Sequence, residues 1–188
     1  MKKLLVFVLA VVLFGSCKKD KDSTVSIGDT YQGGIVFYLD ANGGGLIAAP
    51  YDQSTGAQWG CYNTGISGAD GIGIGTGNQN TLDIEAGCTE AGTAADICAN
   101  LTLGRYSDWF LPSKDELNLI WKNLADSDGD GSNNGTSDSN NLGDFAVSNY
   151  WSSSELDSSF ACAQNFLIVS QDSILKTNYL YVRAVRSF

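Results

Sequence analysis

An apolar run near the amino terminus constrains this chain most, because it decides in which compartment the rest must fold. Lys2 and Lys3 precede the run, which covers residues 4–14 without a charged residue. A positive head followed by a short apolar stretch is typical of a signal peptide. The run is about half as long as the roughly 20 residues of a membrane-spanning helix, so we expect it to direct export and not to span a bilayer.

The apolar run ends in small residues that lead into a cysteine. Gly15 and Ser16 stand directly before Cys17, and this order resembles the site at which lipoprotein signal peptides are cut and the cysteine is acylated. We therefore predict a lipoprotein signal peptide over residues 1–16 and lipidation of Cys17. The alternative is an ordinary secretory signal with an unrelated cysteine near its end.

Residues 17–27 form a charged and polar stretch that cannot bury itself, so we predict a lipidated, flexible tether. Its mixture of Lys and Asp is similar to the surface-export signals of Bacteroidota lipoproteins. That similarity implies an outer-membrane lipoprotein displayed at the cell surface, attached to the membrane through its lipid only. Display at the periplasmic face is the alternative.

Composition narrows what the remaining residues 28–188 can be. Their number suits a single domain with a sizeable core. The chain has 21 acidic and 11 basic residues and a net charge of −10, which argues against nucleic acid or another polyanion as partner. It contains no His, which excludes Ser-His-Asp and Cys-His catalysis and the commonest zinc sites.

The cysteines beyond Cys17 are candidates for disulfide bonds in an exported protein. Cys61, Cys88 and Cys98 lie within one stretch of chain, whereas Cys162 stands apart. We expect one bridge among the first three, and the sequence leaves open which two of them it joins.

Hydrophobic patterning predicts both strands and helices, and hence an α+β fold. Aromatic and β-branched runs predict strands at 34–39, 46–49, 149–154, 160–169 and 179–186. Turn residues separate the first two strands, which should form a hairpin. Residues 51–79 are mostly Gly, Thr, Asn and Ser and are expected to form a long loop.

Capping signals predict where the helices begin. Asn80 and Thr93 are expected to cap helices that begin at residue 81 and cover residues 94–101. Ser113 and Glu116 have the spacing of a capping box. Behind them, apolar residues at helical spacing predict one buried face: Leu117, Ile120, Trp121 and Leu124.

Two arginines lie in the last predicted strand, at residues of opposite parity. In an extended chain Arg183 and Arg186 therefore point to opposite faces. Arginines near buried strands usually pair with carboxylates, and we expect this for both.

Five short motifs follow one another along the chain in an order that is characteristic of a known family. They are Trp-Gly-Cys at 59–61, Gly-Thr-Gly-Asn at 75–78, Asp-Trp-Phe-Leu-Pro-Ser-Lys-Asp-Glu-Leu at 108–117, Tyr-Trp-Ser-Ser-Ser-Glu at 150–155 and Val-Arg-Ala-Val-Arg at 182–186. Together they resemble the DUF1566 family, also called the Lcl C-terminal domain, over residues 28–188. The resemblance implies a C-type-lectin-like domain with a twisted antiparallel sheet, two or three helices and long loops. It also implies a ligand-binding surface protein.

Tryptophans beside polar loops are candidates for contact with a sugar. The rings of Trp59 and Trp151 could stack on the apolar face of a pyranose, with Glu155 as a neighbouring ligand-binding carboxylate. Core packing is the alternative for both rings.

Alternating aspartates in one polar segment match the opening of a calcium loop. Asp126, Asp128 and Asp130 are followed by Gly131 in the order DxDxDG, and Asn134 stands at the ninth position. The twelfth position holds Ser instead of Glu. A calcium site is one interpretation of this segment, and a solvated acidic loop is the other.

These observations predict a surface ligand-binding or adhesion module for a glycan or a cell-surface protein. A structural envelope protein without a small ligand is the main alternative. A carbohydrate-active enzyme, with carboxylates drawn from Asp115, Glu116 and Glu155, is a further one. Formylglycine-generating enzymes, which have a similar fold, use a reactive cysteine pair late in the domain, where this chain has only Cys162. We therefore expect no enzyme activity.

Overall fold

The computed structural model describes residues 25–126, 128–131, 133, 139–168 and 170–188. The predicted signal peptide, the lipidated Cys17 and the tether up to residue 24 lie outside these ranges. Val25, within the predicted tether, packs against the core. No helix in the described ranges combines the length and apolar character that a membrane crossing requires.

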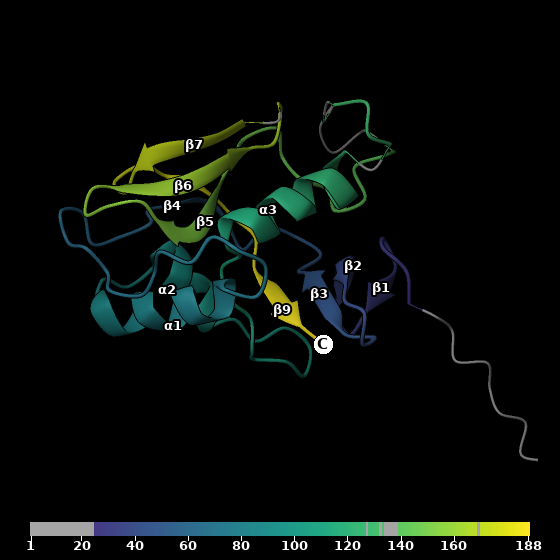
Figure 1. The fold of residues 1–188 in the computed structure, drawn as a ribbon, viewed down its shortest axis with the longest axis horizontal. Coiled ribbons are helices and arrows are strands. Elements are labelled where there is room, and N and C mark those ends of the chain that lie inside the picture. The colour runs from purple at the N-terminus through teal and green to yellow at the C-terminus, as the bar shows by residue number, and fades with distance from the viewer. Residues whose placement is uncertain (1–24, 127, 132, 134–138, 169) are drawn as a thin grey trace, which may run out of the picture.

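An antiparallel sheet of four strands contains the predicted hairpin (Figure 1). Its order is β1-β2-β3-β9, with strands Thr30–Tyr31, Gly34–Leu39, Gly45–Ala48 and Val185–Ser187. The carboxylate of Asp40 accepts hydrogen bonds from the backbone N–H groups of Asn42 and Gly44, so the turn residues close the hairpin locally.

A second sheet has five strands in the order β4-β8-β5-β6-β7. They are Ser54–Ala57, Leu180–Val182, Asn149–Glu155, Phe160–Asn165 and Ser170–Leu175. Only β5 and β8 pair in parallel. β4 lies within the predicted loop. The strand predicted to reach residue 169 ends at Asn165, whose side-chain oxygen accepts from the backbone N–H groups of Leu167 and Ile168 and turns the chain into β7.

The last predicted strand is in fact two strands, β8 and β9, which belong to different sheets. The break occurs because the backbone of Ala184 bonds to a loop instead of a strand. Its carbonyl accepts from the N–H of Ala49, and its N–H donates to the side chain of Gln53.

The helices are α1 (Gly77–Gly87), α2 (Ala94–Ala99) and α3 (Lys114–Ile120), which continues as the π-helical segment η1 (Trp121–Ala125). Thr93 caps α2 as predicted, since its hydroxyl accepts from the N–H of Asp96. Asn80 is not a cap. α1 begins earlier, and the buried Asn80 side chain donates to the carbonyl of Gly71.

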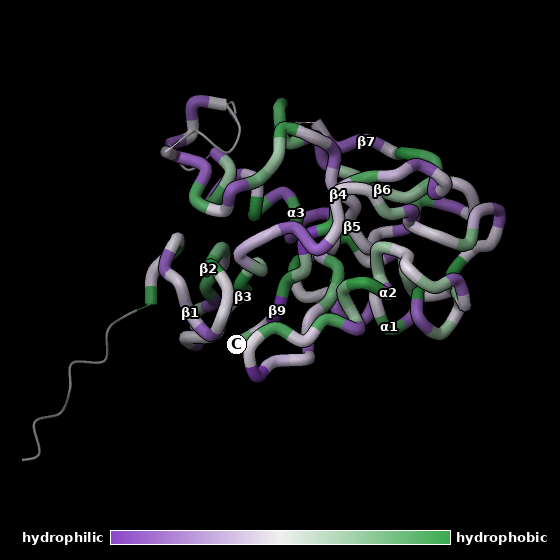
Figure 2. Tube along the Cα trace, turned by 180° about the vertical axis from the view of Figure 1, so that it is seen from behind, coloured by the Kyte–Doolittle hydropathy of each residue, from purple (hydrophilic) through white to green (hydrophobic). Residues whose placement is uncertain are grey.

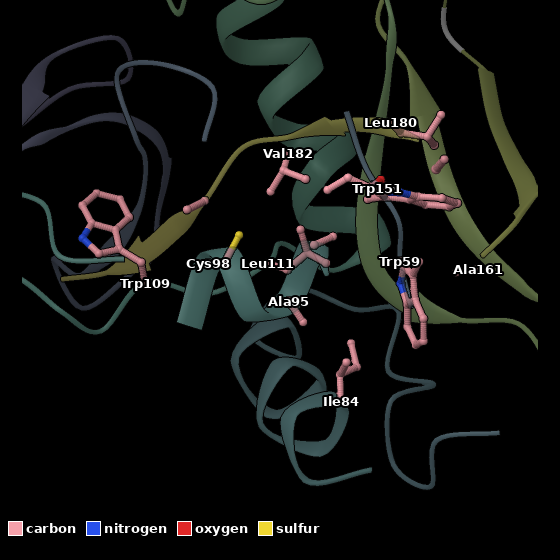
Figure 3. Packing of buried hydrophobic residues seen from close by; sticks show 14 of the residues in the cluster. Trp59, Ile84, Ala95, Cys98, Trp109, Leu111, Trp151, Ala161, Leu180 and Val182 are labelled. Atoms are coloured by element: carbon pink, nitrogen blue, oxygen red, sulfur yellow. Dashed lines mark hydrogen bonds between the residues drawn. The ribbon is translucent and has the colours of Figure 1, made fainter. Parts of the chain in front are cut away.

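Buried side chains form two clusters, and α3 contacts both sheets between them. The first cluster lies where α1 and α2 meet the five-stranded sheet (Figure 3). The second joins α3 and η1 to β2, β3 and the start of β5. All four apolar residues of the predicted helix face are buried in it. The chain is thus a mixed α+β domain with largely antiparallel sheets.

Candidate functional site

The two tryptophans that were candidates for sugar stacking are part of the core. Trp59 is 1% exposed and Trp151 is fully buried, and Figure 3 shows both within the first cluster. Their indole N–H groups donate to the carbonyls of Ser152 and Ala57, each at 2.9 Å. A stacked sugar needs an exposed ring face, so the prediction of a ligand site at these two residues is corrected.

Glu155 serves a structural ion pair. Its carboxylate pairs with Lys176, whose side chain is fully buried, and accepts from the backbone N–H of Ile66 at 2.9 Å. The ammonium of Lys176 also donates to the carbonyl of Thr64 and lies 4.5 Å from the ring centre of Trp59. The Glu155 carboxylate is therefore engaged inside the fold and does not serve as an open ligand-binding group.

Both arginines of the closing segment pair with carboxylates, as predicted. Arg183 is buried and lies 2.7 Å from Asp52, whose carboxylate also accepts from the hydroxyl of Tyr150. Burial raises the pKa of Asp52 despite the nearby Arg183 charge. Arg186 pairs with Asp108.

Glu116 is buried and closes the predicted capping box of α3. Its carboxylate accepts from the backbone N–H groups of Ser113 at 2.8 Å and Gly75 at 2.7 Å. Burial raises its pKa, and those N–H groups oppose the rise. Glu116 therefore joins the Gly75–Gly77 segment to α3. This contact explains why the motif at 75–78 and the motif at 108–117 lie together.

The predicted calcium ligands converge at the end of η1. Asp126, Asp128 and Asp130 each offer a carboxylate oxygen, and these atoms lie within 4.8 Å of one another. Gly129 and Gly131 have φ angles of 72° and 88°, the left-handed conformation that glycine adopts without strain. The N–H of Gly131 donates to the Asp126 carboxylate at 3.1 Å, so the loop folds back over its first residue.

The electrostatics of this acidic cluster favour a bound positive charge. Asp126 is buried, whereas Asp128 and Asp130 are exposed. Burial and the charges of the other two aspartates raise the pKa of Asp126. Several carboxylate oxygens in one turn suit a hard cation such as Ca²⁺. Asn134, the fourth predicted ligand, lies outside the described residues.

A small cleft of about 240 Å³ lies between β4, the segment that joins α1 to α2, and the turn before β8. It is lined by Gly56, Ala57, Gln58, Glu90, Ala91, Gly92, Thr93 and Tyr179. The side chain of Tyr179 is 68% exposed. The sequence did not indicate this cleft, because its walls come from distant segments and Tyr179 stands at the edge of an apolar run.

One predicted disulfide is present and supports a wall of this cleft. Cys61 is bonded to Cys88, while Cys98 and Cys162 are free and buried. The backbone N–H of Cys61 donates to the carboxylate of Glu90 at 2.9 Å. Because the two sulfurs are bonded to each other, they are not ligands for a metal beside Glu90.

No known family model matches this chain, and no curated protein matches it either.

Proposed function

We propose that this protein is an outer-membrane lipoprotein, displayed at the cell surface, whose single domain binds a glycan or a cell-surface protein. The signal peptide predicted over residues 1–16, the predicted lipidation of Cys17 and the predicted tether support the anchoring. The five sequence motifs between residues 59 and 186, together with the mixed α+β fold, support a C-type-lectin-like domain of the DUF1566 type over residues 28–188.

The cleft at Tyr179 is the observation that carries the ligand-binding proposal. A sugar ring presents an apolar face to an aromatic side chain and hydroxyl groups to amides and carboxylates. Tyr179 supplies an exposed ring, while Gln58 and Glu90 line the same cleft. The backbone N–H of Cys61 donates a hydrogen bond that holds the Glu90 carboxylate in place. The Gln58 side chain donates to the carbonyl of Thr177. The cleft volume suits one sugar unit of a larger glycan.

The acidic cluster is proposed to bind Ca²⁺ as a structural ion. Asp126 leaves η1 directly, so a cation held by Asp126, Asp128 and Asp130 would fix the start of the polar loop. The ion would supply positive charge at the place where these three carboxylate oxygens converge. The cluster lies at the end of α3 and η1 and not in the Tyr179 cleft, so the proposed role of the ion is structural.

A glycan array tests this function with the full-length chain purified in a nonionic detergent. We expect binding to a defined set of glycans that is lost in Tyr179→Ala. Tyr51→Ala, which removes a similarly exposed ring outside the cleft, should bind as the unmodified chain does. A flat response with and without calcium, from folded protein, would reject the lectin function.

A structural envelope protein is the second candidate, favoured by the burial of Trp59 and Trp151. A flat array combined with unchanged melting in excess chelator would support it. A carbohydrate-active enzyme has less support, because the carboxylates of Glu116 and Glu155 are both engaged in structural bonds. Release of sugar from bound glycans would favour the enzyme over the structural protein.

A further inference from the structure

The outer strand of the five-stranded sheet, β7, presents a free edge. It pairs with β6 in continuous antiparallel register over all six residues, from Phe160 opposite Leu175 to Asn165 opposite Ser170. It stands last in the strand order, and Figure 1 shows it at the rim of the molecule. No strand in the described part of the chain pairs with its other side. An edge of this kind is a template for another strand.

The register shows which backbone groups of β7 point outward. The N–H of Lys176 donates to the carbonyl of Ser159, so these two opposite residues form a hydrogen-bonded pair. Such pairs alternate along an antiparallel ladder. Ile174 and Asp172 therefore bond to β6, whereas the N–H and C=O groups of Gln171 and Ser173 point away from it. At the two ends of the strand, the N–H of Ser170 donates to the carbonyl of Ile168, and the carbonyl of Leu175 accepts from the N–H of Asn178. Ser173 is the centre of the free edge.

Common protections against edge pairing are absent from β7. The strand contains no Pro and no Lys, its register with β6 has no bulge, and it carries a single charge, on the exposed Asp172. The Gln171 side chain donates to the carbonyl of Lys114 at 2.9 Å, which ties the strand to α3. The free edge is thus held in an extended, ordered form.

Charge indicates what could pair with this edge. Asp172 lies directly before Ser173, and Asp157 lies in the turn before β6, where its carboxylate accepts from the N–H of Phe160 opposite the end of β7. Lys176, directly after β7, is buried in its ion pair and does not offset them. The chain also has a net charge of −10, so a second copy would be repelled.

We propose that β7 accepts an extended, cationic segment of a protein partner as an additional strand. The partner's backbone bonds to Gln171 and Ser173, and its basic side chains lie on the face of Asp172. Alternate side chains on the other face are apolar, since the exposed Leu175 shares that face with Ser173. This is recognition by strand addition. It involves residues other than those of the Tyr179 cleft and is independent of glycan binding.

The test uses the full-length chain and a labelled peptide of alternating Lys and Val with capped ends. Fluorescence anisotropy measures binding, and hydrogen exchange measures protection of the backbone N–H of Ser173. Ser173→Pro is the diagnostic variant, because it removes an outward N–H and no bond to β6. Ser173→Ala is its matched control and keeps that N–H. An alternating Glu and Val peptide controls for charge.

We expect the Lys and Val peptide to bind and to protect Ser173, with affinity that falls as salt is raised. Ser173→Pro should weaken binding by at least about tenfold, while Ser173→Ala stays within about twofold. A second version of the peptide, N-methylated on the residues that face β7, should not bind, which tests the same bonds even if Ser173→Pro unfolds. Absence of binding, equal binding of the Glu peptide, or unchanged binding of the N-methylated peptide would each overturn the proposal.

Discussion

At the scale of single residues, buried charges are the most sensitive points of this protein. Lys176 is fully buried, and its ammonium is surrounded by the Glu155 carboxylate, the carbonyl of Thr64 and the ring of Trp59. A buried ion pair of this kind adds little net stability, yet removal of one partner leaves an uncompensated charge. These residues therefore act as one unit.

Glu155→Ala should lower the free energy of unfolding by about 3–5 kcal/mol, because it leaves the Lys176 ammonium buried without a counter-charge. Urea denaturation followed by tryptophan fluorescence measures the loss. The double variant Lys176→Met/Glu155→Leu removes both charges and should recover most of it. A double variant as unstable as Glu155→Ala would show that packing, and not charge, dominates at this position.

Asp126 should make stability depend on pH in the absence of calcium. Its folded-state pKa is raised above the ordinary 3.8, first by burial, so the folded chain holds this proton more tightly than the unfolded chain does. The contribution of Asp126 to the free energy of unfolding is therefore most favourable below about pH 3.8. It declines as the pH rises through the pKa of Asp126 in the folded chain. In chelator, Asp126→Asn should raise the melting temperature at pH 7 and have little effect at pH 3.5.

At pH 7, calcium should make the melting temperature of the unmodified chain higher than that of Asp126→Asn. Millimolar Ca²⁺ should stabilise the unmodified chain more than Asp126→Asn, because a carboxylate binds the cation more strongly than an amide carbonyl does and binding is linked to folding. Differential scanning calorimetry of both proteins, with calcium and with chelator, gives all four melting temperatures. If the two proteins differ in melting temperature in chelator by the same amount at pH 7 and at pH 3.5, the raised pKa of Asp126 is contradicted.

At the scale of elements, the junction between α1 and α3 depends on close backbone approach. A Cβ atom added at Gly77 would lie 2.2 Å from the Glu116 carboxylate and 2.8 Å from the backbone nitrogen of Ser113. Because Glu116 closes the capping box of α3, one glycine at the start of α1 allows two helices to meet. Gly77 of the Gly-Thr-Gly-Asn motif is thus explained by packing.

Gly77→Ala should lower the free energy of unfolding by about 1–3 kcal/mol, the usual range for an overpacked site. Gly65→Ala is the matched control, because a Cβ there meets nothing within 4 Å. The control should be neutral or slightly stabilising, since alanine reduces the entropy of the unfolded chain. Chemical denaturation compares the two variants, and an equal effect of both would argue against the close contact.

The elements also show where the sequence was sufficient. The capping box at Ser113 and the paired arginines were predicted, because a cap depends on neighbouring residues and a buried charge requires a partner. β4 and β7 were not predicted. Both are outer strands of the sheet with few apolar residues, so their alternation is weak.

The candidate site was less predictable than the fold, for a physical reason. Whether Trp151 faces the core or a ligand depends on the face that β5 turns inward, and its polar neighbours gave no indication of this. The acidic cluster is continuous in sequence and could be recognised from spacing alone. The Tyr179 cleft is assembled from three separate segments, so it becomes visible only in the folded chain.

At the scale of the whole molecule, the final residues connect the two sheets. β8 lies inside the five-stranded sheet, and β9 completes the four-stranded sheet a few residues later. The backbone of Val185 also exchanges two hydrogen bonds with Phe110, and Arg186 pairs with Asp108. Both core clusters contain residues of this closing segment.

Deletion of residues 185–188 should abolish the cooperative unfolding transition. It removes β9, the buried Val185 and the Arg186 ion pair together, a loss comparable to the whole stability of a small domain, about 5–15 kcal/mol. Circular dichroism during heating measures the transition. Ser187→Ala, at an exposed position of the same strand, should melt as the unmodified chain does. A sharp transition in the shortened chain would show that β9 is dispensable.

The crossing from β8 to β9 also sets an order in time. A chain that moves through a membrane with its amino terminus first cannot close either core until its last few residues have emerged. Up to that moment β3 and β5 lack their partners from the carboxyl end, so both sheets stay incomplete. For the proposed exported chain, the segment that completes the fold is thus also the last one to become available.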